Sequence, residues 1–173
     1  MKFNPESVKE IDGIKYRVEE NSKILDNIVK NIISPYCKDL DTYVEFIKDC
    51  LHDGETPPTT QELEDWCMNL STYIYFASGM TEALGIRDDI AKAVYKEVYN
   101  KSRDSIDKGT VADKNSLAEL ESQQEAIISA AYTRSYKVMK AKVENAQELL
   151  GSCKKVLSHR ITEEEMTNFN GGR

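Results

Sequence analysis

The sequence predicts an all-α protein, and two observations support this. Apolar residues recur three or four positions apart through most of the 173 residues, which is the spacing of an amphipathic helix. Prolines and glycines are few, and they place the main breaks near Pro35, at 54–58, at Gly109 and at the C-terminus. We therefore expect a long antiparallel helical hairpin that is preceded by two shorter helices.

The first predicted helix spans residues 5–33. Asn4 and Pro5 favour a helix start, because asparagine accepts hydrogen bonds from free backbone N–H groups and proline has no N–H to leave unpaired. The apolar stripe that follows stops at Pro35, which cannot donate to a helical hydrogen bond. A second, shorter helix is expected at 39–53.

A linker and a capping box open the third predicted helix. Consecutive prolines give the segment 54–58 an extended path. Thr59 and Glu62 then form the pattern of a capping box, in which each side chain pairs with the other residue's backbone N–H. We predict a helix over 60–106, with a break at Gly85 because glycine commonly ends helices.

The last predicted helix spans 110–160. Thr110 and Asp113 resemble a second capping box, and apolar residues then recur on one half of the helical wheel. The connection at 107–110 is too short for anything except a helical hairpin. The helices over 60–106 and 110–160 should therefore pack against each other in antiparallel fashion.

This pattern divides the chain into three parts. Residues 1–58 form a helical pair with an accessory or docking role, residues 59–160 form the hairpin core, and residues 161–173 form an acidic flexible tail. The four cysteines lie far apart, and no secretory leader or membrane-spanning stretch precedes or follows them. We expect a cytoplasmic protein with reduced thiols that does not enter a membrane.

Catalytic and metal-binding patterns have little support in this sequence. Phosphate-binding glycine loops, nucleophile elbows and zincin motifs are absent, and the chain has only two histidines. Cys50, His52 and Cys67 could supply zinc ligands, but their spacing matches no common site. Glu62 and Asp65 form one E-x-x-D pattern without the second acidic motif that a magnesium-dependent hydrolase needs. We expect a protein without enzymatic activity, metal or cofactor.

A row of positive residues on the last helix is the main candidate for function. Residues 126–160 hold seven positive and two negative side chains, although the whole chain has a net charge of −7. We name Arg134, Lys137 and Lys140 the basic row. It could follow a phosphate backbone, with Tyr132 and Tyr136 as stacking platforms for unpaired bases. The alternative is a solvated helix face, or one whose lysines pair with the acidic N-terminal half of the chain.

Several short patterns between residues 66 and 160 resemble a known family. They are Tyr73-Ile-Tyr-Phe76, Lys96-Glu-Val-Tyr-Asn100, Gly109-Thr-Val-Ala-Asp113, and the ending Leu149-Leu-x-x-x-Lys-Lys-Val-Leu-Ser-x-Arg160. In their order and layout they are similar to the helical proteins of phage recombination cassettes, in particular to the UvsY-type recombination mediators. The resemblance covers a little more than half of the chain.

This resemblance implies a non-enzymatic protein that binds single-stranded DNA and assembles into a ring. Such a protein helps a RecA-like recombinase to replace single-strand-binding protein. The basic stretch of these mediators corresponds here to Lys92, Lys96, Lys101 and Arg103. Glu97 and Asp104 lie among these residues and dilute the positive charge.

Self-association is expected because a long hairpin has little neighbouring chain to cover its aromatic residues. These are Trp66, Tyr73, Phe76, Tyr95 and Tyr99. Two functions therefore follow from the sequence: a DNA-binding recombination mediator, or a helical oligomer that contacts only proteins, as a scaffold or as an inhibitor of a host-defence protein.

Overall fold

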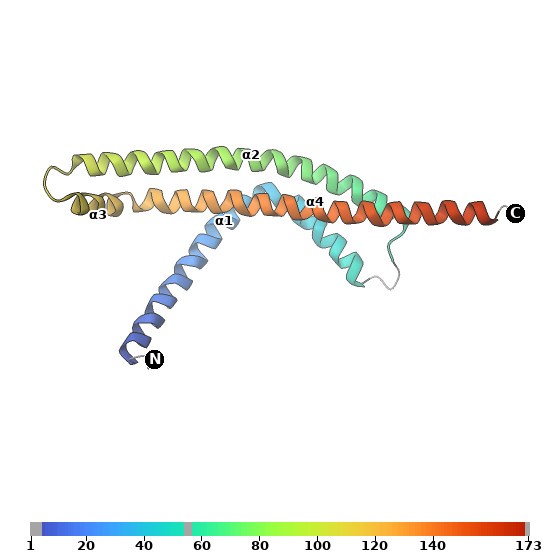
Figure 1. Cartoon of the computed structure of the whole chain (residues 1–173), viewed down its shortest axis with the longest axis horizontal. Helices are drawn as coiled ribbons and strands as arrows, with labels where there is room; N and C mark the ends of the chain where they lie inside the picture. The colour runs from blue at the N-terminus through green and yellow to red at the C-terminus, as the bar shows by residue number, and fades with distance from the viewer. Residues whose placement is uncertain (1–4, 54–56, 172–173) are drawn as a thin grey trace. The chain divides into compact units, whose positions relative to one another are not determined.

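The described part of the protein consists of four α-helices (Figure 1). A computed structural model describes residues 5–53 and 57–171, and it contains α1 (Pro5–Asp53), α2 (Thr60–Ser105), α3 (Val111–Glu121) and α4 (Gln123–Gly171). No strand occurs within the described ranges. The predicted all-α class is confirmed, and so is the packing of two long helices, α2 and α4, against each other.

The two predicted N-terminal helices are a single helix, so this part of the prediction is wrong. α1 continues through Pro35 for 49 residues. Proline removes one hydrogen bond to the carbonyl four residues earlier, but the loss is local. Ile33 and Cys37 on either side are both buried. Their burial favours continuation of the helix, since tertiary packing supplies most of the stability of helices in proteins.

The predicted break at Gly85 is also wrong, because α2 runs without interruption from Thr60 to Ser105. Gly85 lies against the ring of Tyr136 on α4, and a Cβ atom at this position would be 3.4 Å from Tyr136 Cε2. Gly85 therefore lies in contact with a neighbouring aromatic side chain inside the helix and does not end it.

The helix predicted over 110–160 is interrupted at Ser122, and its second part ends later in the sequence than predicted. α3 ends before Ser122, whose hydroxyl and backbone N–H both donate to the carbonyl of Ala118, at 2.7 and 3.0 Å. A serine side chain that competes for a helical carbonyl weakens the regular ladder. α4 then continues beyond residue 160 to Gly171, so residues 161–171 are helical.

Both predicted capping boxes are confirmed. The backbone N–H of Thr59 donates to Glu62 Oε2 at 2.7 Å, and the N–H of Glu62 donates to Thr59 Oγ1 at 3.2 Å. Thr110 and Asp113 form the same reciprocal pair at the start of α3. Each box satisfies backbone N–H groups that have no partner inside the helix.

The chain divides into two compact units. One unit contains the described residues up to Ser34 together with Asp89–Ser135, and its buried side chains are mostly small. The other contains Pro35–Asp88 together with the described residues from Tyr136 on. This second unit has the larger apolar core, made of Leu40, Ile47, Leu63, Trp66, Leu70, Ile74, Leu84, Met139 and Val143.

Within the second unit, α2 and α4 run antiparallel. Thr60 at the start of α2 donates to Glu164 near the end of α4 at 2.9 Å, whereas Gly85 lies beside Tyr136, much earlier in α4. Tyr43 of α1 reaches α2, since the side-chain amide of Asn69 donates to its hydroxyl at 3.1 Å. The core of this unit is therefore enclosed by three helices.

Two glycines provide a test of this local geometry. Gly151 lies inside α4 with no heavy atom within 4 Å of the position of an added Cβ. Gly151→Ala should therefore stabilise the protein by about 0.5–1 kcal/mol. Gly109 has φ +122°, and its Cβ would meet Asp113 Cβ at 3.3 Å. Gly109→Ala should therefore destabilise by roughly 1–3 kcal/mol.

The measurement is urea-induced unfolding, monitored by circular dichroism. The midpoint and the slope of the transition give the free energy of unfolding of each variant. A change in the free energy of unfolding that has the same sign and size in both variants would contradict the assigned backbone conformations.

Candidate functional site

The four basic residues implied by the family resemblance lie on the C-terminal part of α2. Two of them are paired with neighbouring acids: Lys101 with Glu97 at 2.5 Å, and Arg103 with Asp104 at 3.1 Å. Lys92 and Lys96 are exposed on the same helix. The two acids that dilute the sequence pattern are therefore in direct contact with half of the set, which lowers the local positive potential.

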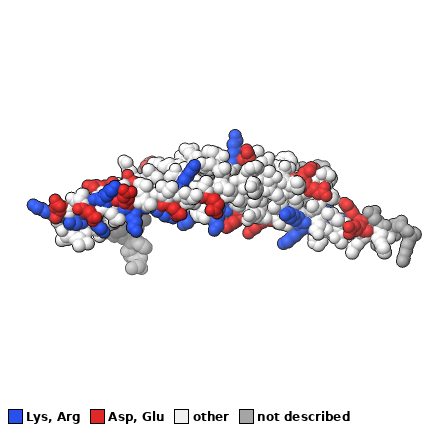
Figure 2. Space-filling view, turned by 90° about the horizontal axis from the view of Figure 1, so that it is seen from above, with Lys and Arg blue, Asp and Glu red and all other residues white. Residues whose placement is uncertain are grey.

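The basic row on α4 is exposed to solvent. Arg134, Lys137 and Lys140 are spaced three residues apart on one helix, and Lys140 also lies 3.9 Å from Glu144. Figure 2 shows positive and negative side chains interspersed along the visible face, without a large patch of one sign. Lys140 of the basic row therefore has a negative neighbour on its own helix.

Two residues near this row have roles inside the fold. Lys142 forms an ion pair with Asp41 of α1 at 2.6 Å, which is the internal pairing that the alternative interpretation of the charges expected. The ring of Tyr136 packs over Gly85. Tyr136 is only partly accessible and Tyr132 is half-buried, so neither ring stands free as a platform for stacking bases.

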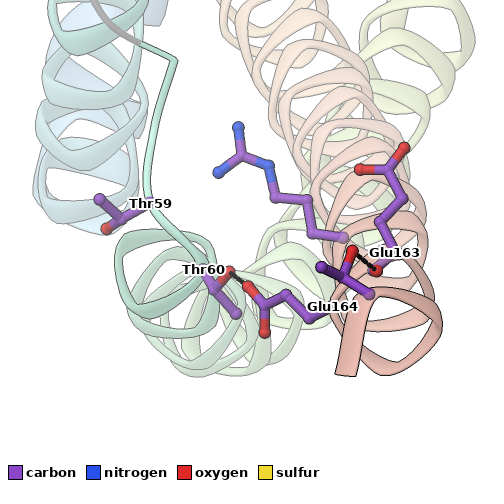
Figure 3. A pocket seen from close by; sticks show the side chains of 6 residues that line it. Thr59, Thr60, Glu163 and Glu164 are labelled. Carbon is purple, nitrogen blue, oxygen red and sulfur yellow. Dashed lines mark hydrogen bonds between the residues drawn. The ribbon is translucent and has the colours of Figure 1, made fainter. Parts of the chain in front are cut away.

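An open hollow of about 740 Å³ lies where α2 begins and α4 nears its end (Figure 3). Its lining consists of Thr59, Thr60, Arg160, Glu163, Glu164 and Thr167. Several of these side chains form hydrogen bonds with other groups of the protein. Thr60 Oγ1 donates to Glu164, Thr167 Oγ1 donates to the Glu163 carbonyl, and the Arg160 guanidinium donates to the Pro58 carbonyl. The hollow therefore lies where the start of α2 is joined to the last part of α4.

The capping contact at this hollow also affects a carboxyl group. Hydrogen bonds from the Thr59 backbone N–H and hydroxyl lower the pKa of Glu62, with a smaller effect from the nearby Arg160 charge. Glu62 is therefore ionised in its capping role. Its use in the capping box does not support the alternative interpretation of Glu62 as a magnesium ligand. Within the described ranges, no group of three or more histidine, cysteine or acidic side chains could hold a metal ion.

The thiols behave as buried apolar groups. Cys37, Cys67 and Cys153 are buried, Cys50 is partly buried, and none forms a disulfide. Burial, followed by the hydrogen bond to Asp41 and the charge of Asp41, raises the pKa of Cys37 to about 11. Burial likewise raises the pKa of Cys67 and Cys153. These thiols lack the thiolate character of catalytic cysteines.

The most distinctive surface is an apolar face of α2 that the sequence reasoning did not identify. We name it the outer face of α2. It lies opposite the buried face of the helix, and most of its side chains are exposed. Its members are Met68, Thr72, Tyr75, Phe76, Gly79, Met80, Ala83 and Ile86. Glu82, which lies three residues after Gly79 and four before Ile86, borders this row and is exposed.

The aromatic residues that the sequence analysis expected to be uncovered differ in their exposure. Trp66 is 4% exposed and belongs to the core, and Tyr73, Tyr95 and Tyr99 are partly covered. Phe76 is 62% exposed. The signal that could have located the outer face is its own three- and four-residue spacing, which a search for a single apolar stripe overlooks.

Comparison with known proteins gives no assignment, since no protein family, curated protein or solved structure shows a significant match to this chain. No helix in the described part combines the length and apolar character needed to cross a bilayer.

The thiol environment gives a direct test of the geometry around Cys37. At pH 8, Cys37 should react with an aromatic disulfide far more slowly than Cys50, because Cys37 is buried whereas Cys50 is partly exposed, and because the rise of the Cys37 pKa from 9.0 to about 11 lowers the thiolate fraction of Cys37 itself roughly a hundredfold. Asp41→Asn should increase the rate at Cys37, since the charge of Asp41 raises this pKa. Mass spectrometry of the modified peptides measures both rates, and equal modification of Cys37 and Cys50 would contradict the assignment.

Proposed function

We propose that this chain is a non-enzymatic helical protein that acts as a homo-oligomer and contacts other proteins. The observation that supports this most is the outer face of α2. Tyr75 is 75% exposed, Phe76 62% and Met68 72%, and all three lie on this face of one helix. Contiguous apolar surface of this kind marks sites of protein association.

The arrangement of the outer face favours a second copy of the same chain as its partner. Five of its residues, Thr72, Tyr75, Gly79, Ala83 and Ile86, follow one another at intervals of three, four, four and three. This order is the same in both directions from Gly79. A two-fold axis at Gly79 therefore brings one α2 onto another in antiparallel orientation with equivalent positions in contact.

The side chains are complementary in this register. Tyr75 of one copy faces Ala83 of the other, and Thr72 faces Ile86, so that large and small residues alternate across the contact. At the axis, no heavy atom lies within 4 Å of the Cβ position of Gly79. Two glycines at this point let the helix backbones approach closely.

The apolar area on this face is sufficient to contribute substantially to an interface. Covering Tyr75 and Phe76 alone would remove on the order of 250 Å² per copy from water. A stable complex typically buries about 800 Å² per partner. These two rings would therefore supply roughly a third of that area, and the aliphatic residues beside them would add more.

Charge placed on this face should separate the copies. Tyr75→Lys combined with Ile86→Lys puts two cations into the contact, where they would lose solvation. We expect the wild type to sediment as a dimer or larger species at micromolar concentration, and the double variant as a monomer. Leu120→Lys on α3 is the matched control, since Leu120 is also highly exposed but lies off this face. A monomeric wild type would refute the proposal.

The second candidate is a single-stranded-DNA-binding recombination mediator, with a RecA-like recombinase and single-strand-binding protein as its partners. It rests on the exposure of the basic row and on the resemblance to the UvsY-type mediators, which short sequence patterns alone support. Arg134, Lys137 and Lys140 could contact successive phosphates. This function needs binding that weakens as salt rises.

Reversal of charge in the basic row tests the DNA proposal. Lys137→Glu combined with Lys140→Glu should preserve helicity, because lysine and glutamate have similar helix propensity. If both lysines contact phosphates, the double variant should bind single-stranded DNA more weakly, with a salt slope lower by about 1.4. Gel retardation at two salt concentrations measures this, with Lys15→Glu and Lys23→Glu on α1 as controls of equal charge change. Absence of any retardation by the wild type would exclude the mediator function.

A further inference from the structure

A second hollow, of about 400 Å³, lies between α1 and α2 in the unit with the larger core. It is lined by Asp39, Thr42, Tyr43, Phe46 and Tyr73. The first four belong to one face of α1, and Tyr73 faces them from α2. We propose that this hollow binds an organic cation, namely a quaternary or methylated ammonium group. This inference is independent of self-association and of DNA binding.

Three aromatic rings form the walls of this site. The ring centroid of Tyr43 lies 5.3 Å from that of Tyr73 and 5.6 Å from that of Phe46, with the ring planes inclined by 44° and 33°. A cation interacts with an aromatic face when it lies within about 6 Å of the ring centroid. Tyr43 is therefore the central one of three neighbouring rings that line the hollow.

The surroundings of the hollow are acidic. Residues 35–53 contain two lysines and five acidic side chains, and residues 60–73 contain three acidic and no basic side chains. Two of these acids are paired with lysines, Asp41 with Lys142 of α4 and Glu45 with Lys48. Asp39 lines the hollow itself and supplies a carboxylate to the bound charge. This field favours a cation over a neutral or anionic ligand.

The central ring is held in place while an outer ring stays accessible. The Tyr43 hydroxyl accepts from Asn69 at 3.1 Å and donates to the Asp65 carbonyl at 3.4 Å. Burial raises the pKa of Tyr43, so the phenol is neutral at physiological pH. Phe46 is 49% exposed, although it is a large apolar residue. A preformed central ring with an open neighbour lowers the ordering cost of binding.

The test uses choline and Nε-trimethyllysine amide as probes, with 3,3-dimethylbutan-1-ol as the neutral analogue of the same shape. Binding is followed through the aromatic ring signals of the intact protein in NMR titrations. We expect at least one cation to bind at millimolar concentration and the neutral alcohol to bind at least fivefold more weakly. Preference for choline indicates a small-molecule ligand, and preference for trimethyllysine a modified protein side chain. Equal binding of the alcohol, or no binding of either cation, overturns the proposal.

Substitutions locate the binding to this hollow. Phe46→Leu and Asp39→Asn should each weaken cation binding by about fivefold or more, whereas Tyr73→Phe keeps the ring and should bind as the wild type does. Tyr75→Leu is the matched control, because it removes an exposed ring from the outer face of α2. All four changes lie at accessible or half-buried positions, and an unchanged thermal transition confirms folding. Loss of binding in Tyr75→Leu with retention in Phe46→Leu would also overturn the proposal.

Discussion

The need to cover both apolar faces of α2 is the constraint on which the rest of the structure depends. One face carries Leu63, Trp66, Leu70, Ile74, Ala77 and Leu84, all buried. Contacts such as that between Gly85 and Tyr136 show this face packed inside the unit. Most side chains of the outer face are exposed among the residues that the structure describes. Because burial of apolar area is the dominant favourable term in folding and association, a second copy of the protein is its simplest partner.

The charges of the chain are arranged for internal pairing more than for a strong external field. Lys142 meets Asp41, Lys101 meets Glu97 and Lys140 lies near Glu144. Exposed pairs of this kind contribute about 0–1 kcal/mol each, so their main effect is to reduce the potential that a polyanion would experience. A positive surplus counted along the sequence therefore overstates the attraction for DNA.

Local signals in the sequence predicted local structure well. The capping boxes at Thr59 and Thr110 were identifiable because a short side chain and an acid three residues later suffice to form them. The continuation of α1 through Pro35 and of α2 through Gly85 was not predictable. These positions depend on neighbours distant in sequence, such as Tyr136, and the usual preferences of proline and glycine point the other way.

The same distinction applies to the candidate sites. The basic residues could be identified from the sequence alone. The structure was needed to show that Lys101, Arg103 and Lys140 lie beside acidic side chains. The hollow at Tyr43 could not be predicted from the sequence, because Tyr73 belongs to a different helix and only the folded structure brings it close. The outer face of α2 was visible in principle, because its symmetric spacing about Gly79 is a property of the sequence alone.

Disulfide trapping between copies tests the central claim most directly. In a background with Cys50→Ser, which leaves only the three buried native thiols, protomers carrying Thr72→Cys are mixed with protomers carrying Ile86→Cys under mild oxidation. Antiparallel pairing about Gly79 predicts rapid formation of the mixed 72–86 dimer and little linkage of either variant with itself. Predominant 72–72 and 86–86 linkage, or no linkage, would contradict the account.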